Sequence, residues 1–226
     1  MGHGRVFGVG PVSLLSGSGF LTRGLTDTGL DLDVIRWLDE RGDGCVVYVC
    51  FGSQKFLTSD QMESLAIGLE DSGVHYVWVV KPEQADLVRA GSGRGFVIKG
   101  WAPQLAILNH QAVGGFLSHC GWNSVLESIL AGVMILAWPM EADQYVNARL
   151  LVEDHGAAVR VCEGNDIVPD SAHLAHIIAK SMSEDKIEKL KAKELKNKAN
   201  EAVKEGGSSS KELERLLKEL SKFDKK

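Results

Sequence analysis

Residues 101–144 read WAPQLAILNHQAVGGFLSHCGWNSVLESILAGVMILAWPMEADQ, and this stretch decides the fold. It contains a short apolar run over 113–117, an amphipathic segment over 123–131 that ends at Gly132, and a second apolar run over 133–137. Short apolar runs bounded by turn residues predict strands that are buried on both faces. A strand, a helix and another strand in this order predict a crossover between parallel strands.

The same alternation continues on both sides of this stretch. The predicted strands are 45–51, 75–80, 96–98, 113–117, 133–137 and 157–161. The predicted helices are 31–41, 58–69, 103–109 (a helical turn), 123–131, 143–153, 171–182, 186–204 and 210–221. We therefore expect an α/β fold, a Rossmann-like doubly wound parallel sheet of about six strands with helices on both faces and extra C-terminal helices.

Composition narrows the class of protein. The chain has 226 residues, 44% of them hydrophobic, and a net charge of -5. The first 180 residues hold no dense stripe of Lys and Arg, so nucleic acid is not an expected partner. No window approaches the roughly 20 apolar residues of a membrane helix, and the first residues do not resemble a signal peptide. Four cysteines without paired spacing are interpreted as buried free thiols, which favours a cytoplasmic location.

The turn between the strand 113–117 and the helix 123–131 is a candidate phosphate site. In a parallel sheet this turn lies at the carboxyl edge, and the free N–H groups that follow Gly121 face a ligand at the positive end of the helix dipole. Asn123 and Ser124 add side-chain donors, and His119 adds another just before them. Considered alone, Asn123 and Ser124 are better explained as helix caps.

A carboxylate and an aromatic ring accompany this turn. Glu127 lies four residues after Asn123, so it shares the face that looks toward the phosphates, and it could accept both hydroxyls of a ribose. Trp101 follows the strand 96–98, where its ring could stack on a nucleobase whose edge meets the backbone of Ala102 and Gln104. Considered alone, Glu127 is equally well an exposed helix residue, and an isolated Trp more often serves packing.

Two polar residues follow the strand 133–137. Asp143 and Gln144 offer acceptors and donors that suit the vicinal hydroxyls of a sugar. Asp143 is also expected to be the N-cap of the helix 143–153.

In combination, these residues resemble the 44-residue signature box of plant secondary-product UDP-glycosyltransferases, which transfer sugars from UDP-sugars to small acceptors. The box is matched by W-A-P-Q at 101–104, H-C-G-W-N-S-x-x-E at 119–127 and W-P-x-x-x-D-Q at 138–144. The flanks agree, with V-G-P at 9–11, W-L at 37–38 and Y-V-C-F-G-S at 48–53.

The resemblance implies a role for each position. The uracil and the ribose would be held by Trp101, Ala102, Gln104 and Glu127. The diphosphate would be held by Ser53, His119, Gly121, Asn123 and Ser124. The sugar would face Trp122, Asp143 and Gln144, and a final Gln resembles members that prefer UDP-glucose. UDP-sugar is a substrate in this family, so neither a cofactor nor a metal is expected.

The resemblance further implies one half of a two-domain GT-B fold. The chain would comprise an interdomain linker remnant over 1–30, a UDP-sugar donor-binding domain over 31–205, and a C-terminal helix over 206–226 that packs on a missing N-terminal domain. In the family that domain supplies the catalytic histidine and the acceptor pocket, so we expect no catalytic residue here. The isolated chain would bind UDP or a UDP-sugar without transferring glucose to a flavonoid or phenol, and leucines exposed on its last helix would favour self-association.

Two other classes of protein are consistent with part of the sequence. A free-standing module that binds UDP or UDP-sugars without catalysis stays open. An NAD-dependent oxidoreductase shares the sheet, but the glycine-rich run 91–95 does not open a helix after a strand. The D-L-D at 31–33 precedes a helix as a cap would, so it is not taken as a metal site. His3 lies in the linker, and no carboxylate partner is evident for the histidines at 75, 110, 155, 173 and 176.

Overall fold

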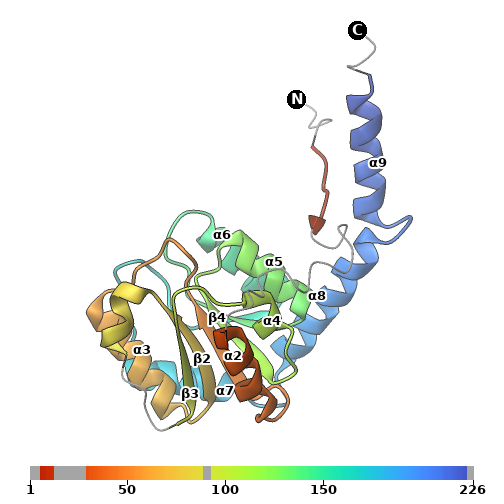
Figure 1. The fold of residues 1–226 in the computed structure, drawn as a ribbon. Coiled ribbons are helices and arrows are strands. Elements are labelled where there is room, and N and C mark those ends of the chain that lie inside the picture. Colours follow the sequence, from red (N-terminus) through yellow and green to blue (C-terminus); the bar gives the residue numbers. More distant parts are fainter. Residues whose placement is uncertain (1–5, 13–28, 89–92, 223–226) are drawn as a thin grey trace.

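The computed structural model describes residues 6–12, 29–88 and 93–222, and a six-stranded sheet lies at its centre (Figure 1). The strand order is β3-β2-β1-β4-β5-β6. The strands are β1 (Val46–Cys50), β2 (His75–Val80), β3 (Gly95–Lys99), β4 (Val113–Ser118), β5 (Met134–Ala137) and β6 (Ala158–Arg160). Every neighbouring pair is parallel, which confirms the predicted doubly wound sheet.

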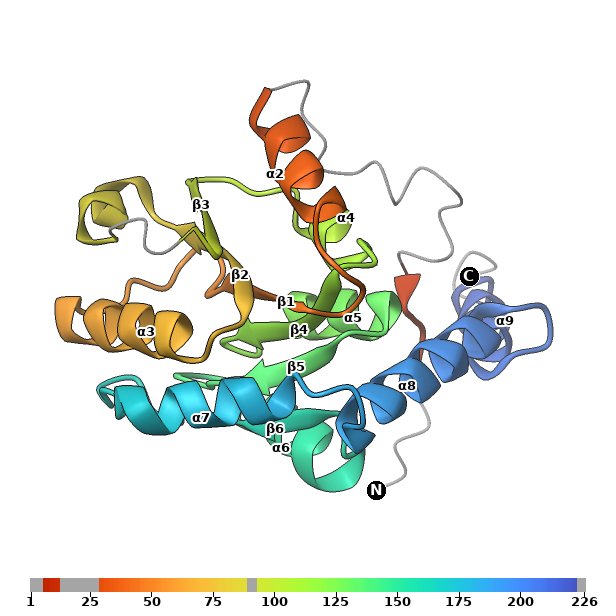
Figure 2. The ribbon, with the colours of Figure 1, turned by 90° about the horizontal axis from the view of Figure 1, so that it is seen from below.

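Helices connect the strands and cover both faces of the sheet, with α7 on one side and α2 and α4 on the other (Figure 2). The helices are α2 (Gly29–Asp39), α3 (Ser59–Asp71), α4 (Gln104–Leu108), α5 (Trp122–Ala131), α6 (Gln144–Arg149), α7 (Ser171–Ser181), α8 (Ile187–Val203) and α9 (Ser208–Leu220). The predicted helices agree with these within a few residues at each end. The predicted linker 1–30, which includes His3, lies mostly outside the described residues.

Two local differences from the prediction concern the type of helix. The predicted helix 143–153 consists of α6 followed by a π-helical turn, η3 (Leu150–Asp154), in which the N–H of His155 donates to the carbonyl of Leu150 five residues earlier. A 3₁₀ helix, η2 (Pro82–Leu87), follows β2 and was not predicted. It is too short to show a helical period in the sequence, and Pro82 sets its first turn.

Alternate residues of each strand point into two separate cores. On β1, Val47 and Val49 pack with α3 and α7, whereas Val46 and Tyr48 pack with α2, α4 and α5. In the second core the Tyr48 ring stacks on Phe116, with the ring centroids 5.0 Å apart. Because both faces of the sheet are covered, a strand such as β1 is a continuous apolar run in the sequence.

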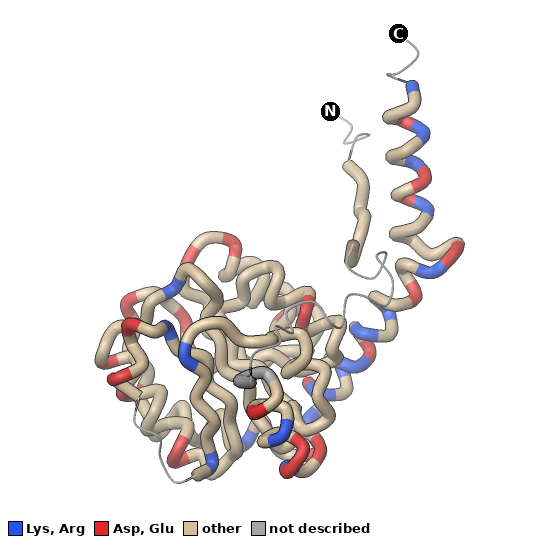
Figure 3. Tube along the Cα trace, viewed as in Figure 1, with Lys and Arg blue, Asp and Glu red and all other residues tan. Residues whose placement is uncertain are grey.

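The C-terminal helices leave the sheet (Figure 1). α8 packs on α5, whereas α9 projects outward with residues 6–12 beside it. The N–H of Gly10 donates to Ser209 Oγ at 2.7 Å, and Arg215 donates to the carbonyl of Val6 while covering the ring of Phe7. Both signs of charge occur along α8 and α9, as a solvated amphipathic helix requires (Figure 3). None of the helices within the described ranges is long and apolar enough to cross a membrane.

Exposure on α9 follows the sequence, whereas exposure at the cysteines does so only in part. Leu217 and Leu220 are exposed, whereas Leu213 and Leu216 on the same helix are half-buried. All four cysteines are free thiols, but only Cys120 is buried. The other cysteines lie at or beyond the ends of strands and pack at the edges of the two cores, where they are half-buried, so the expectation of full burial was wrong for Cys45, Cys50 and Cys162.

Gly114 lies in β4 at a position where the packing leaves no room for a side chain. It is the extra residue of a β-bulge, because Val46 pairs with Val113 and Val47 with Gly115. A Cβ at position 114 would overlap the backbone carbonyl of Gly44. We expect Gly114→Ala to lower the free energy of unfolding by about 1–3 kcal/mol in urea denaturation. Gly42→Ala is the matched control, since a Cβ there meets nothing, and equal stability of the two variants would contradict the packing.

Candidate functional site

A cavity of about 690 Å³ opens at the carboxyl edge of the sheet, beyond the ends of β1 and β4. The chain continues from β1 toward β2 on one side and from β4 toward β5 on the other, so the loops diverge and leave a crevice between them. Most of the predicted site residues line this cavity: Ser53, Trp101, Ala102, Gln104, His119, Gly121, Trp122, Asn123, Ser124 and Glu127. A second cavity of about 690 Å³ lies between residues 6–12 and α5.

The first turn of α5 faces the main cavity with unpaired N–H groups. Gly121 is the N-cap, and no side chain caps the helix. Asn123 and Ser124 lie inside the first turn, so the interpretation of these two residues as caps was wrong. The first intrahelical hydrogen bond of α5 runs from the N–H of Val125 to the carbonyl of Gly121. The preceding N–H groups, from Trp122 to Ser124, donate to no group of the described residues and can therefore bind an anion at the positive end of the helix dipole.

The imidazole of His119 packs between two glycines. A Cβ on Gly52 would lie 2.8 Å from His119 Cε1, and a Cβ on Gly121 would lie 2.7 Å from His119 Nε2. Gly52 also has a φ of 74°, in the left-handed region that favours glycine. The loops after β1 and β4 can therefore meet over this ring only because both positions lack a side chain.

The charge state of His119 is set by this packing. Burial lowers the pKa of His119 below its ordinary value of 6.5, Glu141 and Asp143 oppose the shift, and Lys55 adds to it. His119 Nδ1 is buried and has no hydrogen-bond partner among the residues the structure describes. A neutral imidazole with a free polar atom at the cavity wall is suited to gain a proton when an anion binds.

Glu127 belongs to a hydrogen-bonded network in the cavity wall. Its Oε2 accepts a hydrogen bond from Gln104 Nε2 at 2.6 Å, and the same amide group lies 3.4 Å from Ser124 Oγ. Gln104 Oε1 accepts from the hydroxyl of Tyr48 at 3.2 Å. Burial raises the pKa of Glu127, whereas the hydrogen bond from Gln104 lowers it. The carboxylate is thereby fixed on the face of α5 that lies toward the cavity.

Trp101 stands at the rim of the cavity. Its side chain is 72% exposed, although Ala102 beside it is buried. A side chain that is this exposed contributes little to the core, so the interpretation that Trp101 serves packing was wrong. Its face is available for a planar ligand group.

Asp143 and Gln144 lie where the loop after β5 meets α6, and neither of them lines the cavity. Gln144 is buried, and its Oε1 accepts from the N–H groups of Met140 and Glu141, each at 3.0 Å. Asp143 holds the N-cap position of α6 as expected, but its side chain accepts from Asn147 Nδ2 at 2.8 Å and makes no cap bond.

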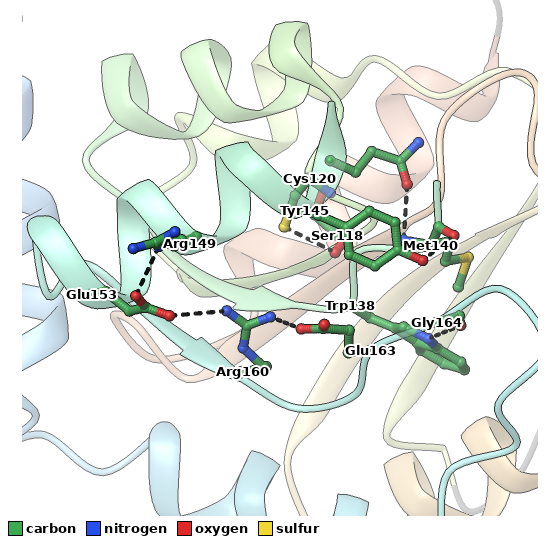
Figure 4. Close-up of polar contacts among 11 residues, drawn as sticks. Ser118, Cys120, Trp138, Met140, Tyr145, Arg149, Glu153, Arg160, Glu163 and Gly164 are labelled. Atoms are coloured by element: carbon green, nitrogen blue, oxygen red, sulfur yellow. Dashed lines mark hydrogen bonds and ion pairs between the residues drawn. The ribbon is translucent and has the colours of Figure 1, made fainter. Parts of the chain in front are cut away.

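Further contacts fix the segment between β5 and α6 and the elements beside it (Figure 4). The Tyr145 hydroxyl donates to the carbonyl of Met140 at 2.6 Å, and Trp138 Nε1 donates to the carbonyl of Gly164. The guanidinium of Arg160 pairs with both Glu153 and Glu163 (Figure 4). The contacts of Tyr145 and Trp138 thus fix the segment that leads from β5 to α6, whereas the ion pairs of Arg160 tie η3 to β6 and to the segment after it.

Two lysines of the cavity were missed by the sequence analysis. Lys55 follows β1, and Lys81 directly follows β2. Lys81 donates to the carbonyl of Ser53 and lies 4.8 Å from the centre of the Phe56 ring. A basic residue just beyond a buried parallel strand was the available signal, because all such positions meet at one edge of the sheet.

The other histidines that the structure describes lie away from the cavity, and one of them differs from expectation. His110 Nε2 lies 3.1 Å from Asp39 Oδ1, so the expectation that it lacks a carboxylate partner was wrong. The two residues are distant in sequence and meet only because β1 and β4 are neighbours. His110 precedes β4 and Asp39 precedes β1, which places the pair at the amino edge, opposite the cavity. Within the described part of the chain, no three His, Cys, Asp or Glu side chains are grouped to hold a metal ion.

The comparisons with known proteins agree with one another. Residues 25–193 match the family model described as UDP-glucoronosyl and UDP-glucosyl transferase. UDP-glycosyltransferase 89A2 and flavonol 3-O-glucosyltransferase UGT89B1, both from Arabidopsis thaliana, are 53% and 49% identical over 98% and 97% of this chain. The alignments cover 48% of each of these relatives, so the chain spans about half their length.

Solved structures show the same fold. Arabidopsis thaliana UGT89C1 complexed with quercetin aligns over 84% of this chain and 46% of its own, with a TM-score of 0.78 and 49% identity. The same protein complexed with UDP-L-rhamnose aligns over 83% of this chain and 46% of its own, with a TM-score of 0.75 and 48% identity.

The packing of His119 generates a pH-dependent prediction. NMR titration of the free chain is expected to give His119 a pKa below 6.5, and saturation with inorganic pyrophosphate is expected to raise it. Because the bound state then takes up a proton, the contribution of His119 to pyrophosphate affinity should increase as the pH falls from the bound-state pKa to the free-state pKa. His173, exposed on α7 and away from the cavity lining, is the internal reference whose resonances should not respond to pyrophosphate at a fixed pH. An unchanged His119 titration in the complex would refute an anion site here.

Proposed function

The chain belongs to the UDP-glucoronosyl and UDP-glucosyl transferase family, and on this premise we propose that it is the donor-binding half of an inverting UDP-glycosyltransferase. The observation that carries the proposal is one cavity in which an exposed Trp ring, a fixed carboxylate and the free N–H groups of a helix follow one another. These groups suit the base, the ribose and the diphosphate of UDP, respectively.

In the proposed complex, the uracil stacks on Trp101, and its edge meets the backbone of Ala102 beside Gln104. Glu127 accepts hydrogen bonds from the ribose hydroxyls. The diphosphate lies against the first turn of α5, where the helix dipole, Lys55 and Lys81 balance its negative charge, as His119 does once it is protonated. The side chains of Ser53, Asn123 and Ser124 donate hydrogen bonds to it. Such a site needs no metal, because the helix and the basic side chains already stabilise the departing UDP.

We further propose that the sugar faces Trp122, Asp143 and Gln144. The Oε1 atom of Gln144 accepts hydrogen bonds from the loop backbone. Its Nε2 atom makes no hydrogen bond to the described residues and can therefore donate to a sugar hydroxyl. Asp143 uses Oδ2 for Asn147 and keeps a second oxygen as an acceptor. Glucose is the proposed sugar, although UGT89C1 was solved with UDP-L-rhamnose.

The acceptor and the catalytic base are proposed to come from a part of the protein that this chain does not span. Inverting transfer requires a base that takes the proton of the acceptor hydroxyl. His119 is the only histidine that lines the cavity in the described part of the chain, and its position beside the α5 N-terminus suits the leaving diphosphate. A flavonoid or phenol acceptor is supported by relatives named for flavonol glucosylation and solved with quercetin.

The same proposal extends to location and assembly. Free thiols at all four cysteines suit a reducing compartment, which supports a cytoplasmic location. The exposed side chains of Leu217 and Leu220 support self-association of the isolated chain through α9.

Calorimetry with UDP tests the donor site. Trp101→Ala and Glu127→Ala are each expected to weaken UDP binding by about tenfold or more, since base stacking and a charged hydrogen bond are each worth about 1–3 kcal/mol. Glu63→Ala, on the exposed face of α3, is the control and should bind as the unaltered chain does. Full UDP affinity in the Glu127→Ala variant would show that the ribose assignment is wrong.

Transfer assays separate the donor half from a binding module without catalysis. The 226-residue chain is expected to transfer no glucose from UDP-glucose to quercetin when it is assayed alone. Addition of the N-terminal half of flavonol 3-O-glucosyltransferase UGT89B1 is expected to produce transfer that Glu127→Ala reduces. Transfer by the chain alone would contradict the proposal, and UDP binding without transfer in either assay would favour the binding module.

A further inference from the structure

We propose that Tyr48 is a positioning residue for the ribose-binding carboxylate of Glu127, acting through the amide of Gln104. The inference rests on the proposed function, because it assigns a task to a buried strand residue in the cavity wall that acts on the ribose site through another side chain. It also connects the hydrophobic core of the sheet to the selectivity of the cavity.

The position of Tyr48 is fixed by packing. It lies on β1 with no exposed surface, between β2 and β4, and its ring stacks on Phe116 at a centroid distance of 5.0 Å and an interplanar angle of 28°. Only the hydroxyl reaches the polar network, where it donates to Gln104 Oε1 at 3.2 Å. Tyr48 thus presents a single donor from a rigid element to a side chain on the first turn of α4.

Gln104 needs such an anchor because it is long and half-buried. A glutamine side chain has three rotatable bonds, and its amide can present either an acceptor or a donor to a neighbour. Tyr48 holds the oxygen end, so the nitrogen end faces Glu127 and donates at 2.6 Å. Without the hydroxyl, the oxygen end of Gln104 loses its partner, and only the contacts of its nitrogen end with Glu127 and Ser124 remain to hold the amide against rotation.

The protonation of the network favours this direction of donation. Burial raises the pKa of Tyr48 well above its ordinary value, and burial also raises the pKa of the adjacent Cys50 thiol, so both groups remain protonated. Glu127 is the charged acceptor at the other end, and Lys81 is the cation beside Cys50. The hydrogen bond from Gln104 lowers the pKa of Glu127 against the effect of burial and so helps to keep the carboxylate ionised for the ribose.

The test uses Tyr48→Phe in the 226-residue chain, which removes the hydroxyl and keeps the stacked ring. Calorimetry gives the Kd of UDP and of 2′,3′-dideoxyuridine 5′-diphosphate, which lacks both hydroxyls that Glu127 would bind. We expect the variant to weaken UDP binding by about three- to tenfold, the size of one hydrogen bond, with little change for the dideoxy nucleotide. The preference for UDP over the dideoxy nucleotide is therefore expected to fall by the same factor.

The matched control is Tyr76→Phe. Tyr76 is buried on the neighbouring strand β2, and its hydroxyl donates to Glu70 at 2.6 Å, away from the cavity lining. This variant should keep the preference of the unaltered chain. A general loosening of the sheet in Tyr48→Phe would instead weaken both nucleotides equally, and that result would overturn the proposal.

A second measurement tests the route through Gln104. In a Gln104→Ala background, Tyr48→Phe is expected to cause no further loss of UDP affinity, because the connecting amide is already gone. A further loss of the full size would overturn the proposal. If the unaltered chain shows no preference for UDP over the dideoxy nucleotide, both the ribose contact and the role of Tyr48 are refuted. If it shows the preference and Tyr48→Phe retains it, only the role of Tyr48 is refuted.

Discussion

The packing of the His119 ring between Gly52 and Gly121 is the constraint on which the cavity depends. It joins the loop after β1 to the loop after β4, where these central strands are neighbours and their crossovers leave toward opposite sides of the sheet. A Cβ at Gly52 would press on the ring from the loop after β1, and a Cβ at Gly121 would press on it from within the loop after β4, so either would displace His119. The same packing withdraws His119 from water and favours its neutral form until an anion binds.

Around this contact, some polar groups of the site are hydrogen-bonded within the protein, and others remain available to a ligand. Glu127 and Gln104 are held by one another and by Tyr48, and Gln144 is held by the loop backbone. No side chain of the described residues caps the N–H groups of the first turn of α5, and the ring of Trp101 is exposed. Buried or partly buried N–H groups normally find an acceptor, so an uncapped helix beside basic side chains favours an anionic ligand. Rigid support combined with open contacts is the arrangement that a preorganised binding site requires.

Much of the fold could be predicted because strands covered on both faces leave unbroken apolar runs such as 45–51. The grouping of the site residues was also predictable, since the carboxyl ends of parallel strands meet at one edge. What escaped prediction depends on contacts between distant segments. The pairing of His110 with Asp39 follows from the strand order, and the role of Gln144 follows from a turn that folds its side chain back on the loop. The π-helical turn η3 leaves no period in a sequence that otherwise suits an α-helix.

The central claim is that one nucleotide bridges Trp101 and the N-terminus of α5. A ¹H–¹⁵N NMR titration of the 226-residue chain with UDP measures this directly. The largest changes are expected at the indole N–H of Trp101 and at the backbone amides of 122–124, which saturate together. Trp122 and Asn123 also line the second cavity, so the indole of Trp101 is the deciding probe. Changes at Phe7–Val12, Leu126 and Leu130 without a change at Trp101 would contradict the claim, as would an α5 N-terminus that does not respond to UDP.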